Sequence, residues 1–107
     1  MFARMLQFEI RPEKKAEFIT VLKNEVVPIL KKQVGFLEIL PLFPLVEKKT
    51  VVNISIWATQ ADAERYQKEV YPRVNEIVKP FLLTPVTVTP LTLETELCQH
   101  FEEILAA

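Results

Sequence analysis

The chain of 107 residues contains one glycine, one cysteine and one histidine, and these scarcities exclude several kinds of site. With Gly35 as the only glycine, no glycine-rich loop can cradle a phosphate. With Cys98 as the only cysteine, no disulfide can form within the chain and a four-cysteine zinc site is impossible. Charges of both signs are intermixed and sum to -1, so the basic stripe that a nucleic-acid binder needs is missing. We therefore expect no nucleic-acid partner.

Long hydrophobic runs are also missing. A membrane-spanning helix needs about 18 or more apolar residues in succession, and the chain has no such run. Residues 1–10 are interrupted by Arg4, Gln7 and Glu9, which is not the pattern of a signal peptide. A single free thiol is compatible with a reducing compartment. The sequence therefore predicts a cytoplasmic protein without a membrane partner.

The chain is rich in apolar residues: 50% of its residues are hydrophobic and 25% are charged. This composition and length predict one globular domain over residues 1–107. Period-2 alternation predicts strands, and steps of three and four residues predict helices. The strands are expected over 2–10, 36–43, 50–57 and 86–89. One helix is expected over 12–35 and a second over 59–70, with further helical turns up to residue 80. A C-terminal helical extension is expected over 93–107. This order predicts an α+β, ferredoxin-like βαββαβ fold with an antiparallel four-stranded sheet.

Prolines mark irregular points in these elements. Pro28 lies inside the first predicted helix, where we expect a kink or an unpaired carbonyl near residue 24. Pro41 predicts an edge or a bulge in the second strand, and Pro90 is expected to bound the last strand.

Apolar side chains occupy both sides of the predicted strands. Val52, Ile54 and Ile56 share one side of the third strand, and Val51 and Trp57 lie on the other. Phe36, Leu40 and Leu42 are likewise expected to share one side of the second strand. Two helices cover only one face of a sheet, so the other face should be polar in a monomer. We expect a homodimer through the sheet faces that buries about 1,600 Å² or more. The alternative is that the C-terminal helix folds back over the second face.

Four short segments within roughly residues 2–93 follow one another in a recognisable order. They are the helix start at 12–15, the helix-to-strand junction at 28–36, the strand-to-helix step at 57–63, and the stretch from Tyr71-Pro72-Arg73 to Pro80-Phe81-Leu82 before a valine-rich strand. Their order and spacing resemble those of the antibiotic biosynthesis monooxygenase-type family of dimeric α/β barrels. The resemblance implies a dimeric α/β barrel with 93–107 as an extra helix.

For function, the resemblance implies a choice of activities. Some relatives oxidise electron-rich aromatic compounds with O2 and without metal or flavin, some degrade haem, and some process small signalling carbonyl compounds. The haem-degrading pattern needs an asparagine on the first strand, where this chain has Arg4 and Gln7, and a histidine near the second helix, which 66–76 lacks. The missing histidine also weakens the signalling-compound activity. We therefore expect no cofactor.

Asn53 and Trp57 are the predicted catalytic residues. They lie four apart on one strand and share a face, with Ser55 between them. An amide and an indole N–H could stabilise a substrate oxygen as negative charge develops before reaction with O2, and the pair resembles an Asn and Trp used by some oxygenases of the family. The alternative is that Trp57 fills the core and Asn53 satisfies a sheet edge.

Arg4, Tyr66 and Tyr71 are the predicted substrate-binding residues. Arg4 lies on an apolar strand face and could bind an anionic substrate group, or instead form an ion pair with a carboxylate such as Glu38. If the second helix continued without a break, Tyr66 and Tyr71 would not share a face. Either could offer a phenol to a pocket, or keep its hydroxyl in water.

The other candidate site residues have less support from the sequence. His100 has nearby glutamates but no second histidine, so we predict no metal site. Cys98 is expected to act as a small apolar residue. The apolar run 40–46 could line a pocket mouth or cross the dimer seam. Two hypotheses remain: a cofactor-independent monooxygenase acting on a small hydrophobic or aromatic metabolite, and a non-catalytic dimeric module that binds ligands or partners.

Overall fold

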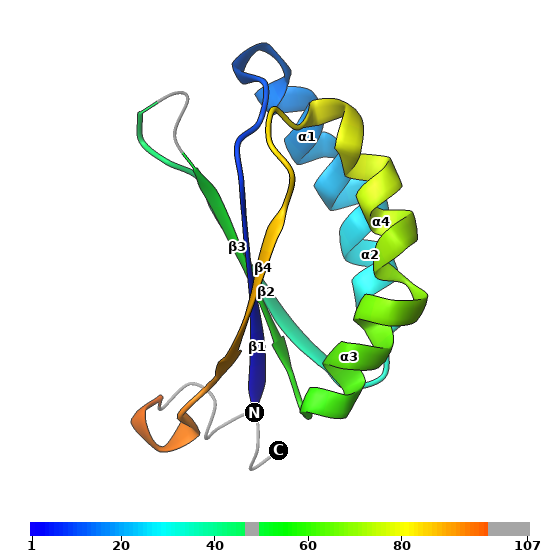
Figure 1. Cartoon of the computed structure of the whole chain (residues 1–107), viewed down its shortest axis with the longest axis vertical. Helices are drawn as coiled ribbons and strands as arrows, with labels where there is room; N and C mark the ends of the chain where they lie inside the picture. Colours follow the sequence, from blue (N-terminus) through cyan, green and yellow to red (C-terminus); the bar gives the residue numbers. More distant parts are fainter. Residues whose placement is uncertain (47–49, 99–107) are drawn as a thin grey trace.

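A computed structural model describes residues 1–46 and 50–98 of the chain (Figure 1). Its four strands form one antiparallel sheet in the order β2-β3-β1-β4. The strands are β1 (Phe2–Phe8), β2 (Phe36–Leu42), β3 (Val51–Trp57) and β4 (Thr87–Thr92). The predicted α+β ferredoxin-like fold is confirmed.

The helices all lie on one face of this sheet (Figure 1). They are α1 (Lys15–Val21), α2 (Val27–Lys31), α3 (Gln60–Glu69) and α4 (Tyr71–Val78). The main core lies between the helices and the sheet, where Phe18 and Trp57 are fully buried. No helix of the described residues is long and apolar enough to cross a membrane. We call this side of the sheet the inner face and the opposite side the outer face.

The first helix is interrupted where proline was expected to disturb it. Residues Leu22–Val26 form a π-helical segment between α1 and α2, in which the Val27 N–H donates to the Leu22 carbonyl. Pro28 follows at once and offers no N–H, so the α-helical bond to the carbonyl four residues earlier cannot form. The chain responds with one wide turn and then continues as α2, as in many π-bulges.

The second helix is broken near Val70, where the predicted helix over 59–70 was expected to end. α3 ends at Glu69, Val70 has φ -119° and ψ -39°, and α4 begins at Tyr71. Pro72 in the first turn of α4 lacks the N–H that a continuous helix would need. This break brings the rings of Tyr66 and Tyr71 to 6.2 Å between centroids. The separation of the two tyrosines that an unbroken helix would give therefore does not apply.

The second strand changes register near its start. Phe36 pairs with Trp57, but the next pair is Glu38 with Ile56, so one extra residue lies between them. A single inserted residue reverses the side on which the following side chains lie. Phe36 therefore contacts Trp57 on the inner face, whereas Leu40 continues on the outer face opposite Ile54. The expectation that Phe36 and Leu40 share a side is wrong.

Both edge strands of the sheet contain a proline. Pro41 lies in β2, which has the edge position that was one of the two predicted alternatives, whereas the register shift of β2 lies earlier, between Phe36 and Glu38. Pro90 lies within β4 rather than at its end, because an edge strand tolerates a residue without an N–H.

The outer face carries a small apolar cluster at one end. Ala3 and Ile56 are buried there, and the partly buried residues packed against them are Met1, Leu37, Ile54, Leu93 and Cys98. Further along this face Leu42 is 53% exposed and Leu91 is 40% exposed. Among the described residues, the segment after β4 thus covers one end of the outer face, and not the whole of it.

The predicted C-terminal helix over 93–107 is wrong for its described part. Only Thr95–Leu97 is helical, as one 3-10 turn, and Cys98 is extended with φ -123° and ψ 93°. The remainder of the predicted helix, with His100, lies outside the described residues.

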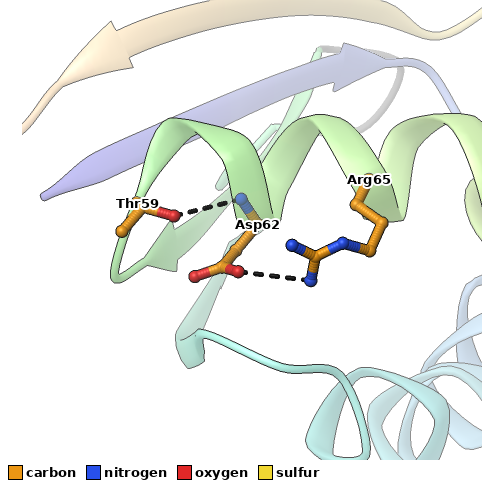
Figure 2. A network of polar contacts seen from close by, with 3 residues as sticks. All are labelled: Thr59, Asp62 and Arg65. Atoms are coloured by element: carbon orange, nitrogen blue, oxygen red, sulfur yellow. Dashed lines mark hydrogen bonds and ion pairs between the residues drawn. The ribbon is translucent and has the colours of Figure 1, made fainter.

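Gly35 joins α2 to β2 in a conformation that favours glycine, with φ +82°. Its carbonyl accepts a hydrogen bond of 2.7 Å from the Ala58 N–H. A Cβ atom built on Gly35 would lie 2.6 Å from the Cβ atom of Asp62. Asp62 is itself fixed, because Thr59 Oγ1 caps its N–H at 3.1 Å and Arg65 Nη1 lies 3.3 Å from its Oδ1 (Figure 2). The helix-to-strand junction and the start of α3 are therefore packed together without room for a side chain.

Candidate functional site

An internal cavity lies between the inner face of the sheet and the helices. Most of its wall is aliphatic or aromatic, and the lining residues are Arg4, Leu6, Phe8, Phe18, Leu22, Val26, Leu30, Ile39, Asn53, Ser55, Tyr66, Tyr71, Val74, Val78 and Val86. The space open to the centres of water molecules is about 40 Å³, enough for a few waters at about 10–15 Å³ each. An apolar hollow with a few convergent polar groups is the usual form of a small-molecule site.

Arg4 brings a positive charge into this cavity. It lies on β1, where it pairs with Ser55 of β3 on one side and with Pro90 of β4 on the other, and it is only 4% exposed. Its guanidinium carbon lies 5.1 Å from the ring centroids of both Tyr66 and Tyr71. These cation–π contacts hold the charge against the helices.

The polar partner of Arg4 is an amide and not a carboxylate. Arg4 Nη2 donates a hydrogen bond to Gln67 Oε1. Glu38, the carboxylate considered from the sequence, pairs in register with Ile56 on the outer face, so the predicted alternative of an Arg4–Glu38 ion pair is wrong. Among residues 1–46 and 50–98, no Asp or Glu lies in the wall of the cavity.

Burial controls the charge states around Arg4. Desolvation lowers the pKa of Arg4, and the two nearby phenols oppose that shift. Desolvation raises the pKa of Tyr66 to about 12, which the charge of Arg4 offsets only in part, and it also raises the pKa of Tyr71. At neutral pH both phenols are therefore neutral hydrogen-bond donors beside a guanidinium ion.

The described partners of this buried charge are all neutral. Taking a charged group out of water costs several kcal/mol. Each of the two cation–π contacts returns about 0.5–2 kcal/mol, and a hydrogen bond from a charged donor returns about 1.5–3 kcal/mol. Among the described residues, the Arg4 charge is therefore held in the cavity by neutral groups, without a carboxylate in the wall.

Asn53 supplies a second polar point in the same wall. It lies on β3 between Leu6 and Pro41 in register. Its Oδ1 atom is buried and has no hydrogen-bond partner among the described residues. A buried acceptor without a partner costs about 1–3 kcal/mol. Rotation about χ2 exchanges the oxygen and the nitrogen of the Asn53 amide, so this side chain can offer a ligand either an acceptor or two N–H donors.

Trp57 is placed behind the cavity wall rather than in it. It is fully buried, and its Nε1 donates to Ser55 Oγ at 3.0 Å. Its ring packs against Tyr66 with 5.0 Å between centroids and meets Phe36 edge-on at 5.5 Å. Ser55, and not Trp57, lines the cavity. Of the five predicted site residues, the structure thus brings Arg4, Asn53, Tyr66 and Tyr71 to one cavity.

Two residues of this arrangement were missed by the sequence analysis. Ser55 lies between Asn53 and Trp57 on the same strand face, so its place in the wall follows from the alternation. Gln67 lies four residues before Tyr71 and does not line the cavity, and no sequence signal indicated that its side chain would accept a hydrogen bond from Arg4.

The remaining candidates lie away from the cavity. Cys98 packs on the outer-face cluster, and His100 lies outside the described residues. No residue of the apolar run 40–46 lines the cavity, and Phe43 packs on Phe18 in the core. Within the described part of the chain, no group of three or more His, Cys, Asp or Glu residues could hold a metal ion.

Together, the fold and the cavity define a small α+β domain whose candidate ligand site lies between sheet and helices. The family model for antibiotic biosynthesis monooxygenases matches residues 1–73. The chain belongs to this family, as the sequence resemblance predicted.

Solved structures share the fold at low sequence identity. SnoaB from Streptomyces nogalater, described as a cofactor-independent oxygenase, is 16% identical with a TM-score of 0.73, over 87% of this chain and 92% of its own. A protein of unknown function from Nitrosomonas europaea is 15% identical with a TM-score of 0.69, over 87% of this chain and 88% of its own. A conserved protein from Methanosarcina mazei is 12% identical with a TM-score of 0.70, over 88% of this chain and 94% of its own. No curated protein matches the chain in sequence.

Proposed function

We propose that the protein is a cofactor-independent, monooxygenase-like enzyme acting on a small hydrophobic or aromatic metabolite. The observation that carries the proposal is the Arg4 charge, 4% exposed, which only neutral groups of the described residues hold in a mostly apolar cavity. Membership of the monooxygenase family and the fold shared with SnoaB support it.

The proposed chemistry needs negative charge on the substrate. A phenol that loses its proton becomes electron-rich enough to give electrons to O2. When one O2 oxidises a phenol to a quinone, one oxygen atom enters the ring, and the other leaves as water with the two hydrogens removed. No further reductant is required. Arg4 and the neutral phenols of Tyr66 and Tyr71 would stabilise the anionic forms.

Asn53 and Trp57 take different parts in this proposal. The unpaired amide of Asn53 would contact the substrate oxygen directly. Trp57 would act through Ser55, because its N–H is already donated to the Ser55 hydroxyl. It is therefore a positioning residue unless that bond opens when substrate binds.

The cavity must widen to admit an aromatic ring. Its present space of about 40 Å³ is well below the roughly 150 Å³ of an apolar cavity that holds benzene. Leu22 and Val26 are the first and last residues of the π-helical segment, and both also line the cavity. We propose that this irregular turn changes conformation when the ligand binds and so widens the cavity.

Oxygen uptake with a panel of hydroxylated aromatic compounds tests the function. We expect O2 consumption with at least one of them. We expect Asn53→Ala and Arg4→Gln each to lower kcat/KM by about 10- to 100-fold, because each removes a polar group that would bind the substrate and stabilise its negative charge. Gln7→Ala is the matched control, since Gln7 lies on β1 with the opposite side-chain parity to Arg4. Unchanged rates in both site variants would remove these residues from the mechanism.

The second candidate is a non-catalytic module that binds the same kind of ligand. The small volume of the cavity favours it, as does the fact that none of the described residues in its wall is a histidine. Binding of a hydroxylated aromatic compound without any oxygen uptake would decide for this module.

We further propose that the protein is a cytoplasmic homodimer joined through the outer face. Leu40 is 38% exposed there, Leu42 53% and Leu91 40%, beside the partly buried Ile54. Light scattering at micromolar concentration should give twice the chain mass for the parent and the single mass for Leu42→Glu. Val34→Glu, at a residue 71% exposed outside the sheet, should leave the dimer intact. A monomeric parent would contradict the proposal.

A further inference from the structure

The charge pattern of the inner cavity indicates what kind of ligand it takes. We infer that the ligand is a single-ring aromatic acid, whose carboxylate pairs with Arg4 and whose opposite end carries a hydroxyl that meets Asn53. This inference rests on the proposed use of the cavity as the ligand site, and it names the chemical class within it.

The first argument is the unused binding capacity of Arg4. A guanidinium group has five N–H donors and matches a carboxylate with two parallel hydrogen bonds. Among the described residues, Arg4 donates hydrogen bonds to the Gln67 amide oxygen and to the Tyr66 hydroxyl, which leaves some of its five donors unused. The cation–π contacts with Tyr66 and Tyr71 engage its charge. Arg4 therefore keeps donors for a ligand carboxylate.

The second argument is that the described residues supply no anion at this point. Among residues 1–46 and 50–98, Arg4 is the one charged residue in the cavity wall. A shallower pocket of about 250 Å³ on the other side of Arg4 contains Glu64, whose Oε1 accepts from Gln60 Nε2 at 2.8 Å. Glu64 would repel an anion in that outer pocket. The inner cavity is therefore the place where an anion gains most from Arg4.

The third argument is the spacing of the two polar points. Arg4 is level with Ser55 in the register of β1 and β3, and Asn53 lies two residues further along β3. At a rise of about 3.3 Å per residue, the backbone levels of Arg4 and Asn53 are offset by about 6–7 Å along the strands. A ring that lies along the strands therefore has a polar residue at each of two levels of the inner face. Leu6, between Arg4 and Phe8 on the same strand face, provides apolar contact for the ring.

The test is calorimetric binding at constant ionic strength with three probes of nearly equal shape. We expect 4-hydroxybenzoate to bind the parent at least about tenfold more tightly than 4-hydroxybenzamide, because only the former carries a charge for Arg4. We expect it also to bind several-fold more tightly than benzoate, which lacks the hydroxyl for Asn53.

Each variant should remove one preference and leave the other. Arg4→Gln should abolish the preference for carboxylate over carboxamide, and Arg4→Lys should keep part of it. Asn53→Ala should abolish only the preference for the hydroxyl. Glu64→Gln, in the outer pocket, is the matched control and should leave both preferences unchanged. Thermal melts would verify that each variant is folded.

The inference is overturned if carboxylate and carboxamide bind the parent alike, if the preference survives Arg4→Gln in a folded variant, or if 4-hydroxybenzoate does not bind at about 10 mM. The binding test requires no turnover, so its result is separate from that of oxygen uptake. Charge preference without O2 consumption would keep the anion site and reject the oxygenase. O2 consumption without charge preference would support the oxygenase and reject the anion site.

Discussion

Trp57→Ala is expected to lower the free energy of unfolding by about 3–5 kcal/mol, the usual cost of removing a large buried aromatic side chain. Trp57 is fully buried and packs against the rings of Phe36 and Tyr66. Its removal also leaves Ser55 Oγ without the indole N–H that it now accepts. Urea denaturation followed by circular dichroism measures the change.

Trp57→Phe separates packing from hydrogen bonding at the same position. It keeps an aromatic ring and should cost less, about 1–3 kcal/mol, much of it from the unpaired Ser55 hydroxyl. The double variant Trp57→Phe with Ser55→Ala removes both partners and should recover part of that loss. If the double variant is no more stable than Trp57→Phe, the bond between the two side chains contributes little to stability.

The same variant tests the role that the sequence suggested for Trp57. If its N–H contacts the substrate, oxygen uptake by folded Trp57→Phe should fall as far as that of Asn53→Ala. If Trp57 acts only through Ser55, most activity should survive at temperatures where the variant is folded. The present position of the N–H, 3.0 Å from Ser55 Oγ, leads us to expect the second result.

Gly35→Ala is expected to cost about 3 kcal/mol of folding free energy. A residue with a side chain pays roughly 1–3 kcal/mol to hold a positive φ such as the +82° of Gly35. The new Cβ would also lie 2.6 Å from the Cβ of Asp62, which is fixed by the helix backbone and by the capped start of α3 (Figure 2). Relief requires the helix-to-strand junction to shift.

A thermal melt measures this effect, because 1 kcal/mol moves the midpoint by about 4–8 °C in a domain of this size. The matched control is Val34→Ala, one residue earlier and 71% exposed, which should change stability by less than about 0.5 kcal/mol. A Gly35→Ala midpoint within about 3 °C of the parent would mean that the junction is more adaptable than its packing indicates.

The sequence predicted the parts of the structure that depend on local pattern. Alternation placed Arg4, Leu6 and Phe8 on one strand face, and all three line the cavity. It also placed Asn53 and Trp57 on one face of β3, where they are found. The register shift near Phe36 was not visible, because an inserted residue leaves an apolar strand equally apolar on both sides.

The sequence pattern did not predict the features that depend on tertiary contacts. The break at Val70 turns Tyr71 toward Tyr66, although Pro72 alone did not show in which direction the chain would turn. The partner of Arg4 was expected to be a carboxylate, and it is the amide of Gln67, 63 residues away in the chain. The Trp57 N–H was assigned to a substrate, but a hydroxyl two residues earlier satisfies it.

The prolines in β2 and β4 restrict how two molecules could associate. A strand at the border of a sheet invites an incoming strand from another chain, because its outward N–H and carbonyl groups are unpaired. Pro41 and Pro90 each remove one of the donors that such a ladder would require, one on either border. Both borders of the sheet therefore carry a position that opposes the addition of a further strand, which protects the sheet against growing sideways into fibrils.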